Sequence, residues 1–182
     1  MGFGWSVGAG AVSPRRRIAV PLLTAVALLV LPAPAALRPP EAQAAPKPWN
    51  GRYQMLTFAS QKAGTSAASR QRENDFGAVF TLATQCTVTT CTATVVDGPR
   101  PGNQTVPWPA RYTWNGSEWG SSYDWLWDCA VGAGGQKQWA HATSWTFFRP
   151  QPDGSLKGTW HTDIAEGPCR GSVVMPVAAL PA

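Results

Sequence analysis

Apolar and polar residues alternate with a period of two along most of the chain beyond residue 49. The clearest case is the stretch 119–129, whose even-numbered positions are mainly small or acidic. Its odd-numbered positions carry mostly aromatic side chains: Trp119, Ser121, Tyr123, Trp125, Trp127 and Cys129. Because successive side chains of a strand point to opposite faces, this stretch predicts a half-buried β-strand with one aromatic wall.

The same alternation, bounded by turn residues, predicts eight extended segments in the chain. They lie near residues 50–59, 76–82, 90–96, 112–114, 117–129, 137–149, 156–164 and 169–177. A polar stretch at 60–74 predicts a long loop or a short helix, and the three prolines of 97–107 predict a loop. No amphipathic helical period of useful length interrupts the strands. The pattern predicts an all-β fold, an antiparallel eight-stranded meander. We favour an up-and-down, lipocalin-like barrel over a sandwich, because closure removes exposed strand edges.

One connection between strands has a specific turn signal. The dipeptide Asn115-Gly116 separates Tyr112-Thr113-Trp114 from the aromatic strand. Asn-Gly readily adopts the positive φ angles of a type I′ turn, so the sequence predicts a two-residue hairpin here.

The first 44 residues have the composition of a secretory signal peptide. Three arginines at 15–17 precede a mainly apolar stretch of fourteen residues at 18–31, and Ala42-Gln43-Ala44 fits a cleavage site. The apolar run falls short of the roughly 20 residues that a membrane span needs. We therefore expect cleavage after Ala44, with an uncleaved anchor as the alternative, and a single domain over 45–182. The domain would be secreted or associated with the cell envelope, and would contact a membrane only if the leader is uncleaved.

The charge of the chain argues against nucleic acid as a partner. The whole chain has a formal net charge of +5, but residues 45–182 hold 11 basic and 9 acidic side chains, a net charge of +2. The basic excess belongs largely to the leader, so the electrostatic argument for nucleic-acid binding is lost.

The four cysteines all lie in the exported part of the chain, where an even number predicts two disulfides. Three connectivities are possible. If residues 87–90 form a turn, Cys86 and Cys91 face each other across it, and proximity then favours Cys86–Cys91 and leaves Cys129 with Cys169. The spacings match no common zinc-ligand pattern, so we expect no metal.

Several short motifs together resemble a known group of proteins. They are Cys86 to Val95, Tyr112-Thr113-Trp114, Asp128-Cys129, Pro150 to Leu156, Gly158-Thr159-Trp160 and Cys169-Arg170-Gly171. This set resembles small exported mycobacterial proteins and extracellular segments of some mycobacterial receptor-type serine/threonine kinases. The resemblance implies export, paired cysteines and a β-rich domain, and it carries over no catalytic residue. We expect no kinase portion in this chain, which lacks a phosphate-binding loop.

The sequence offers little catalytic chemistry. His161 and Asp163 share a strand face and Glu166 follows them, but a polar outer face explains this trio better than acid–base or metal chemistry. We expect His141 near the core, on a strand face that it shares with Trp139. No hydrolase motif is present. We therefore expect no catalytic residue, no cofactor and no enzyme activity, with a hydrolase as the remote alternative.

Nine tryptophans in residues 45–182 are the main functional signal. Such rings either fill a core or line a site for apolar ligands and sugars. The sequence predicts a non-catalytic domain that binds a small apolar or glycan ligand, or an envelope protein, through its aromatic positions. The candidate ligand-binding residues are Trp119, Tyr123, Trp125, Trp127, Trp139 and His141. The alternative is a purely structural or interaction module with every tryptophan in the core.

Overall fold

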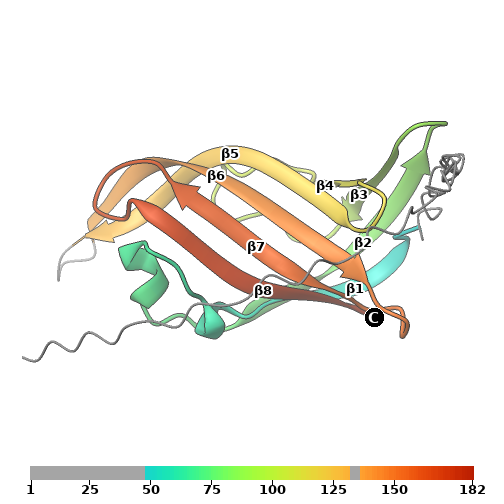
Figure 1. The fold of residues 1–182 in the computed structure, drawn as a ribbon, viewed down its shortest axis with the longest axis horizontal. Helices are drawn as coiled ribbons and strands as arrows, with labels where there is room; N and C mark the ends of the chain where they lie inside the picture. Colours follow the sequence, from blue (N-terminus) through green and yellow to red (C-terminus); the bar gives the residue numbers. More distant parts are fainter. Residues whose placement is uncertain (1–47, 132–135) are drawn as a thin grey trace, which may run out of the picture. The chain divides into compact units, whose positions relative to one another are not determined.

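The computed structural model describes residues 48–131 and 136–182, and the predicted leader, residues 1–44, lies outside this part. Eight antiparallel strands form one closed barrel, with each strand paired to its neighbours in sequence and β1 paired to β8 (Figure 1). The strands are β1 Gly51–Thr57, β2 Phe76–Cys86, β3 Cys91–Asp97, β4 Arg111–Trp114, β5 Trp119–Val131, β6 Gln136–Pro150, β7 Leu156–Ile164 and β8 Gly171–Pro181. The predicted all-β barrel is confirmed. Within the described residues, no helix is long and apolar enough to cross a membrane.

The register between β5 and β6 decides which side chains enter the barrel. Trp125 pairs with Ala142 and Tyr123 pairs with Ser144, so the aromatic side chains of β5 face small side chains across the ladder. Ala142 and Ser144 are both buried. The predicted aromatic wall of β5 therefore points inward, and the large rings are accommodated because β6 contributes small residues to the same face.

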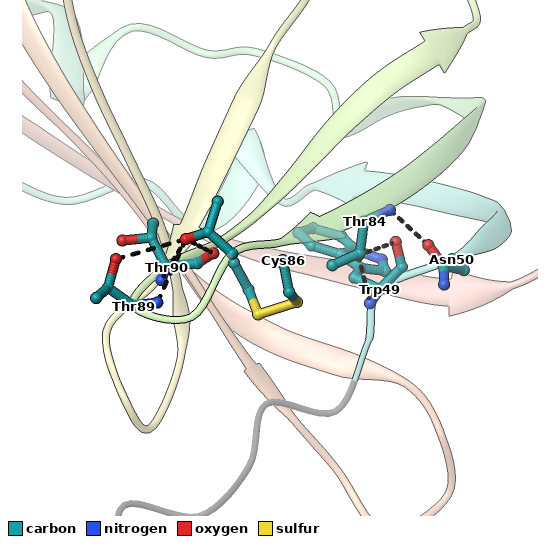
Figure 2. The surroundings of a disulfide bond; sticks show 8 residues. Trp49, Asn50, Thr84, Cys86, Thr89 and Thr90 are labelled. Atoms are coloured by element: carbon teal, nitrogen blue, oxygen red, sulfur yellow. Dashed lines mark hydrogen bonds between the residues drawn. A yellow bond between two sulfur atoms is a disulfide. The ribbon is translucent and has the colours of Figure 1, made fainter.

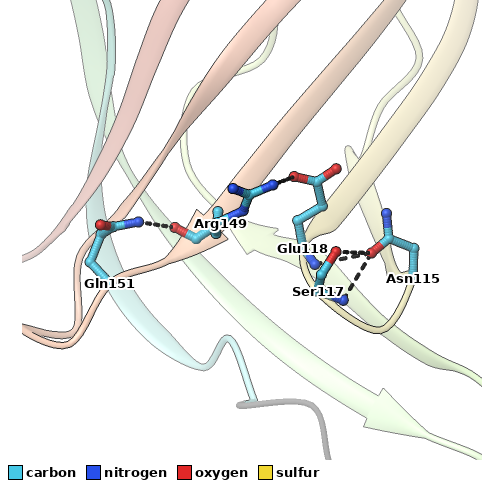
Figure 3. A network of polar contacts seen from close by, with 5 residues as sticks. All are labelled: Asn115, Ser117, Glu118, Arg149 and Gln151. Carbon is cyan, nitrogen blue, oxygen red and sulfur yellow. Dashed lines mark hydrogen bonds and ion pairs between the residues drawn. The ribbon is translucent and has the colours of Figure 1, made fainter. Parts of the chain in front are cut away.

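The connection between β4 and β5 differs from the predicted two-residue turn. Trp114 pairs with Trp119, which leaves residues 115–118 as a longer loop. The Asn115 side-chain oxygen accepts hydrogen bonds from the backbone N–H groups of Ser117 and Glu118, both at 3.0 Å (Figure 3). The Asn115 N–H donates to the Glu118 carbonyl at 3.1 Å and closes the loop, while the Asn115 side chain satisfies two further amides. The two-residue prediction was wrong.

Both pairs of cysteines form disulfides. Cys86 and Cys91 are directly opposite each other in the β2–β3 hairpin, whose turn is tied by hydrogen bonds among its threonines (Figure 2). The second bridge joins Cys129 near the end of β5 to Cys169, which precedes β8. This is the pairing that the hairpin interpretation favours.

The polar stretch between β1 and β2 contains two short 3-10 helices, η1 Ala59–Gln61 and η2 Ala67–Arg70. It lies along the start of β8 (Figure 1), where Ala63 and Val174 form a β-bridge. The Ser66 side chain donates a hydrogen bond to the Cys169 carbonyl at 2.5 Å. These contacts hold the segment against the barrel.

The buried residues form two core clusters. The first core cluster contains Trp49, Leu82, Cys91, Ala93, Val95, Tyr112, Trp119, Phe148, Leu156, Val177 and Ala179. The second core cluster contains Ala59, Ala68, Cys129, Ala140, Ala142, Ile164, Cys169, Val173 and Met175. Trp49, which precedes β1, anchors the first cluster, since its ring lies 5.0 Å from that of Tyr112 and 5.1 Å from that of Phe148.

Candidate functional site

A cavity of about 620 Å³ lies inside the barrel, bounded by members of the first core cluster and by rings that pack against the second. Its wall is mainly apolar. The residues that line it from the strands include Met55, Phe76, Ala78, Phe80, Val95, Tyr112, Tyr123, Trp125, Thr146, Phe148, Trp160 and Val177. Its volume falls in the range of roughly 300–1,000 Å³ that small-molecule sites occupy.

The candidate residues of β5 have different positions relative to this cavity. Tyr123 and Trp125 line it. Trp119 is fully buried in the first core cluster, where its ring lies 5.4 Å from that of Trp114. The ring centroid of Trp127 lies 5.3 Å from that of Trp125 in a tilted arrangement, and Trp127 packs against the second core cluster. The aromatic wall therefore serves two purposes, since its middle faces the cavity and its ends fill the core.

Trp139 and His141 are not brought to the cavity. Their register partners are Asp128 and Leu126, which belong to the outward-facing positions of β5, so both side chains lie on the outer surface of β6. Trp139 is 54% exposed, and His141 is exposed too. The expectation of a histidine near the core was wrong, because β6 turns its small residues inward. Since Trp139 is exposed, the tryptophans do not all lie in the core.

A short chain of polar groups joins three adjacent strands, β5, β6 and β7, on the inner side of the barrel wall. The Trp125 indole N–H donates to the Ser144 hydroxyl at 2.9 Å, and the Ser144 and Thr162 hydroxyls lie 2.7 Å apart. Burial raises the pKa of Tyr123 above its ordinary value and raises that of Tyr112 further. Both phenols are therefore neutral near pH 7, and the strand wall of the cavity carries no charge from them.

The barrel has a seam between β4 and β5, and the cavity reaches it. β5 forms thirteen register pairs with β6 but two with β4, so most of its other edge lacks a neighbouring strand. Arg111 and Ser122 occupy outward-facing positions on the two strands, yet both line the cavity and both are exposed. The cavity is therefore open to solvent along this seam.

The loop 98–110 lies over the seam. The Asn103 side-chain amide donates to the Leu126 carbonyl at 2.7 Å, and the Leu126 N–H donates to the Thr105 hydroxyl at 3.0 Å. Two loop side chains thus satisfy backbone groups on the free edge of β5. The loop also contributes cavity-lining residues: Pro99, Arg100, Pro101, Gly102, Asn103, Val106, Pro107, Trp108, Pro109 and Ala110.

Sequence reasoning identified this segment as a loop but did not assign it to a site. Trp108 is the loop residue that could have indicated the site from the sequence. A tryptophan among prolines can bury its ring only if the loop covers an apolar surface. In the structure its ring lies 6.4 Å from that of Phe80 at the cavity wall. The loop is the part of the site that the alternation of strands could not indicate.

The acid–histidine trio at the end of β7 is divided between different contacts. His161 and Asp163 form a pair at 2.8 Å on the outer face, where His161 also packs against Trp145. Glu166 instead accepts a hydrogen bond from the His141 backbone N–H at 3.3 Å. In residues 48–131 and 136–182, no group of three or more His, Cys, Asp or Glu side chains could hold a metal ion.

A closed antiparallel barrel of eight strands with an internal cavity is the architecture of the lipocalin-like barrels. A family model described as the PknI serine/threonine-protein kinase sensor domain matches residues 45–181. The chain therefore belongs to the PknI sensor-domain family. The resemblance to extracellular segments of mycobacterial receptor-type kinases is confirmed.

One solved structure supports the fold, and a second matches this chain less well. The monomer form of the M. tuberculosis PknI sensor domain matches with a TM-score of 0.57 and 20% sequence identity, over 76% of this chain and 90% of that chain. The dimer form of the same sensor domain matches with a TM-score of 0.48 and 22% identity, over 65% of this chain and 84% of that chain. No curated protein matches this chain.

Proposed function

We propose that this chain is an exported, non-catalytic sensing domain that binds a small apolar ligand in its barrel cavity. The observation that carries the proposal is the cavity of about 620 Å³ at the seam between β4 and β5. A barrel of this strand number can be filled by side chains or can hold one small ligand. The open space within the wall of Tyr123, Trp125, Phe80 and Trp160 favours the second use.

The lining supports an apolar ligand more than a glycan. Aromatic and aliphatic side chains make up most of the strand wall, and burial of apolar surface is the largest source of affinity in such sites. Hydroxyl and indole groups such as Ser144 and Trp125 are already paired with each other. The buried indole N–H of Trp160 on the same wall has no partner among the described residues, but a single donor cannot replace the hydrogen bonds that a polyhydroxylated sugar makes with water.

Export is supported by the two disulfides, which persist in oxidising compartments. The predicted leader and the kinase sensor domains of the family agree with this location. An envelope protein as the partner stays the rival proposal, and it is favoured by exposed apolar side chains such as Trp139 and Val96.

A pair of neighbouring substitutions tests the cavity. Ala78 faces the cavity and Val79, beside it on β2, faces outward. We expect Ala78→Phe to abolish most binding of the neutral apolar dye N-phenyl-1-naphthylamine, measured by dye fluorescence, and Val79→Phe to preserve it. Native mass spectrometry of protein purified from its own host should also show a co-purifying small molecule. Dye binding that is equal in both variants, with no co-purifying molecule, would refute the proposal.

A further inference from the structure

The charged residues at the rim of the cavity indicate what kind of head group its ligand carries. Arg100 of the loop and Arg111 of β4 line the cavity, and no other ionised side chain is among its lining residues. Both are exposed, so they lie where the cavity meets solvent. The site therefore has an apolar interior and an entrance whose ionised lining side chains are all positively charged.

These two arginines have no carboxylate partner within the described part of the chain. Three other cations there form ion pairs: Lys62 with Glu73, Lys137 with Asp128, and Arg149 with Glu118 at 3.3 Å (Figure 3). Arg52, Arg70, Arg72, Lys157 and Arg170 form none in this part of the chain, so what sets Arg100 and Arg111 apart is that they also line the cavity. No carboxylate of residues 48–131 or 136–182 lies within 4.0 Å of either rim guanidinium. Guanidinium groups bind carboxylates and phosphates in a bidentate manner, so two unpaired ones beside an apolar cavity suit an anion.

We infer that the cavity binds a single-chain amphiphile, with its alkyl tail inside the barrel and an anionic head group at Arg100 and Arg111. The inference rests on the proposed function and specifies the ligand class of the same site. The tail would contact the wall around Tyr123 and Trp125, where neutral rings line the space. The head group would stay at the seam, where it remains hydrated and can pair with the two guanidinium groups.

The class of ligand can be tested with a set of probes that share one tail. The set contains dodecanoate, dodecyl phosphate, dodecan-1-ol and dodecyltrimethylammonium, each used below its micelle concentration, with affinity measured by displacement of N-phenyl-1-naphthylamine. We expect the two anionic probes to bind about tenfold or more tighter than the alcohol, a difference of about 1.4 kcal/mol. The cationic probe should bind weakest. A comparison of dodecanoate with dodecyl phosphate distinguishes a fatty acid from a phosphorylated lipid as the source of the anion.

Tail length gives an independent readout of the interior. Burial of one methylene contributes about fourfold in affinity, so decanoate should bind about fifteenfold more weakly than dodecanoate. A carboxylate that is bound only at the exposed arginines would show no such dependence.

The rim is tested with the double variant Arg100→Gln/Arg111→Gln. Its control is Arg52→Gln, an exposed arginine of β1 that does not line the cavity. We expect the double variant to lose about tenfold in dodecanoate affinity and to bind dodecan-1-ol as before, whereas the control changes neither. All three side chains are exposed, so the variants should fold, and circular dichroism checks this.

Two results would overturn the inference, and they differ in what they say of the cavity. If the alcohol binds as tightly as the anions and the double variant binds dodecanoate normally, the head-group assignment fails while binding in the cavity stands. If no probe binds and Ala78→Phe behaves like the unaltered protein, both the inference and the proposed function fail.

Discussion

The two disulfides should contribute unequally to stability, and the difference follows from the lengths of the loops that they close. Cys86 and Cys91 are five residues apart, whereas Cys129 and Cys169 are 40 residues apart. In the chain-entropy model the short bridge contributes about 2 kcal/mol to the free energy of unfolding and the long bridge about 4 kcal/mol.

Burial adds to the same difference. Cys129 and Cys169 are 0% and 1% exposed within the second core cluster, while Cys86 is exposed at the hairpin. Replacing the buried pair by alanine also removes packed sulfur atoms from the core. We therefore expect Cys129→Ala/Cys169→Ala to lose at least about 2 kcal/mol more than Cys86→Ala/Cys91→Ala.

The measurement is equilibrium unfolding in urea, followed by tryptophan fluorescence, for the protein and the two double variants. Removing a cross-link also expands the unfolded chain, so the comparison uses the free energy extrapolated to water rather than the midpoint alone. Equal losses in the two variants, or a larger loss for the hairpin pair, would refute the reasoning from loop length.

Three further predictions concern the loop, the sheet and a turn. Asn103→Ala removes the hydrogen bond to the Leu126 carbonyl, so it should lower the free energy of unfolding in urea by about 1–2 kcal/mol. It should also speed the release of the dye in stopped-flow experiments. An unchanged release rate would show that the loop does not control access to the cavity. Gly158→Ala should destabilise by more than about 3 kcal/mol or prevent folding, because its Cβ would overlap a backbone oxygen of β6, and a normal thermal transition would contradict this. Asp153 accepts hydrogen bonds from Ser155 that lower its pKa, so its carboxyl should titrate below the ordinary value in NMR spectra. A group whose pKa is lower in the folded than in the unfolded protein stabilises the fold above its unfolded pKa, and this stabilisation is lost as pH falls through the folded pKa. Asp153→Asn should therefore remove this part of the acid dependence of stability. A titration of the Asp153 carboxyl at its ordinary pKa would contradict the assignment.

The strand pattern was sufficient to predict the architecture. In β5 the alternation from Trp119 to Cys129 assigns each side chain to one of the two faces of the strand. This assignment needs no information about any other strand. Turn residues between such segments then indicate successive hairpins. For a meander of eight strands, closure into a barrel is the simplest way to protect the edge strands.

The sequence could not decide which face of β6 enters the barrel. Both faces of this strand are plausible core faces, since one carries Trp139, Trp145 and Phe147 and the other carries alanines, a serine and Phe148. The choice depends on the volume that β5 already occupies on the inner side, which is a property of the paired strands. Reading β6 alone placed His141 near the core, and the register with β5 placed it in solvent.

The sequence by itself determined the period-two pattern of the strands, the even number of cysteines and the concentration of indoles, because each depends on local chemistry or on composition. The tertiary structure alone decided the cavity, the seam between β4 and β5, and the presence of both Arg100 and Arg111 among the residues that line the cavity. Those features depend on how strands of unequal length pair and on where a proline-rich loop lies across the gap, and neither has a signature along a single stretch of chain.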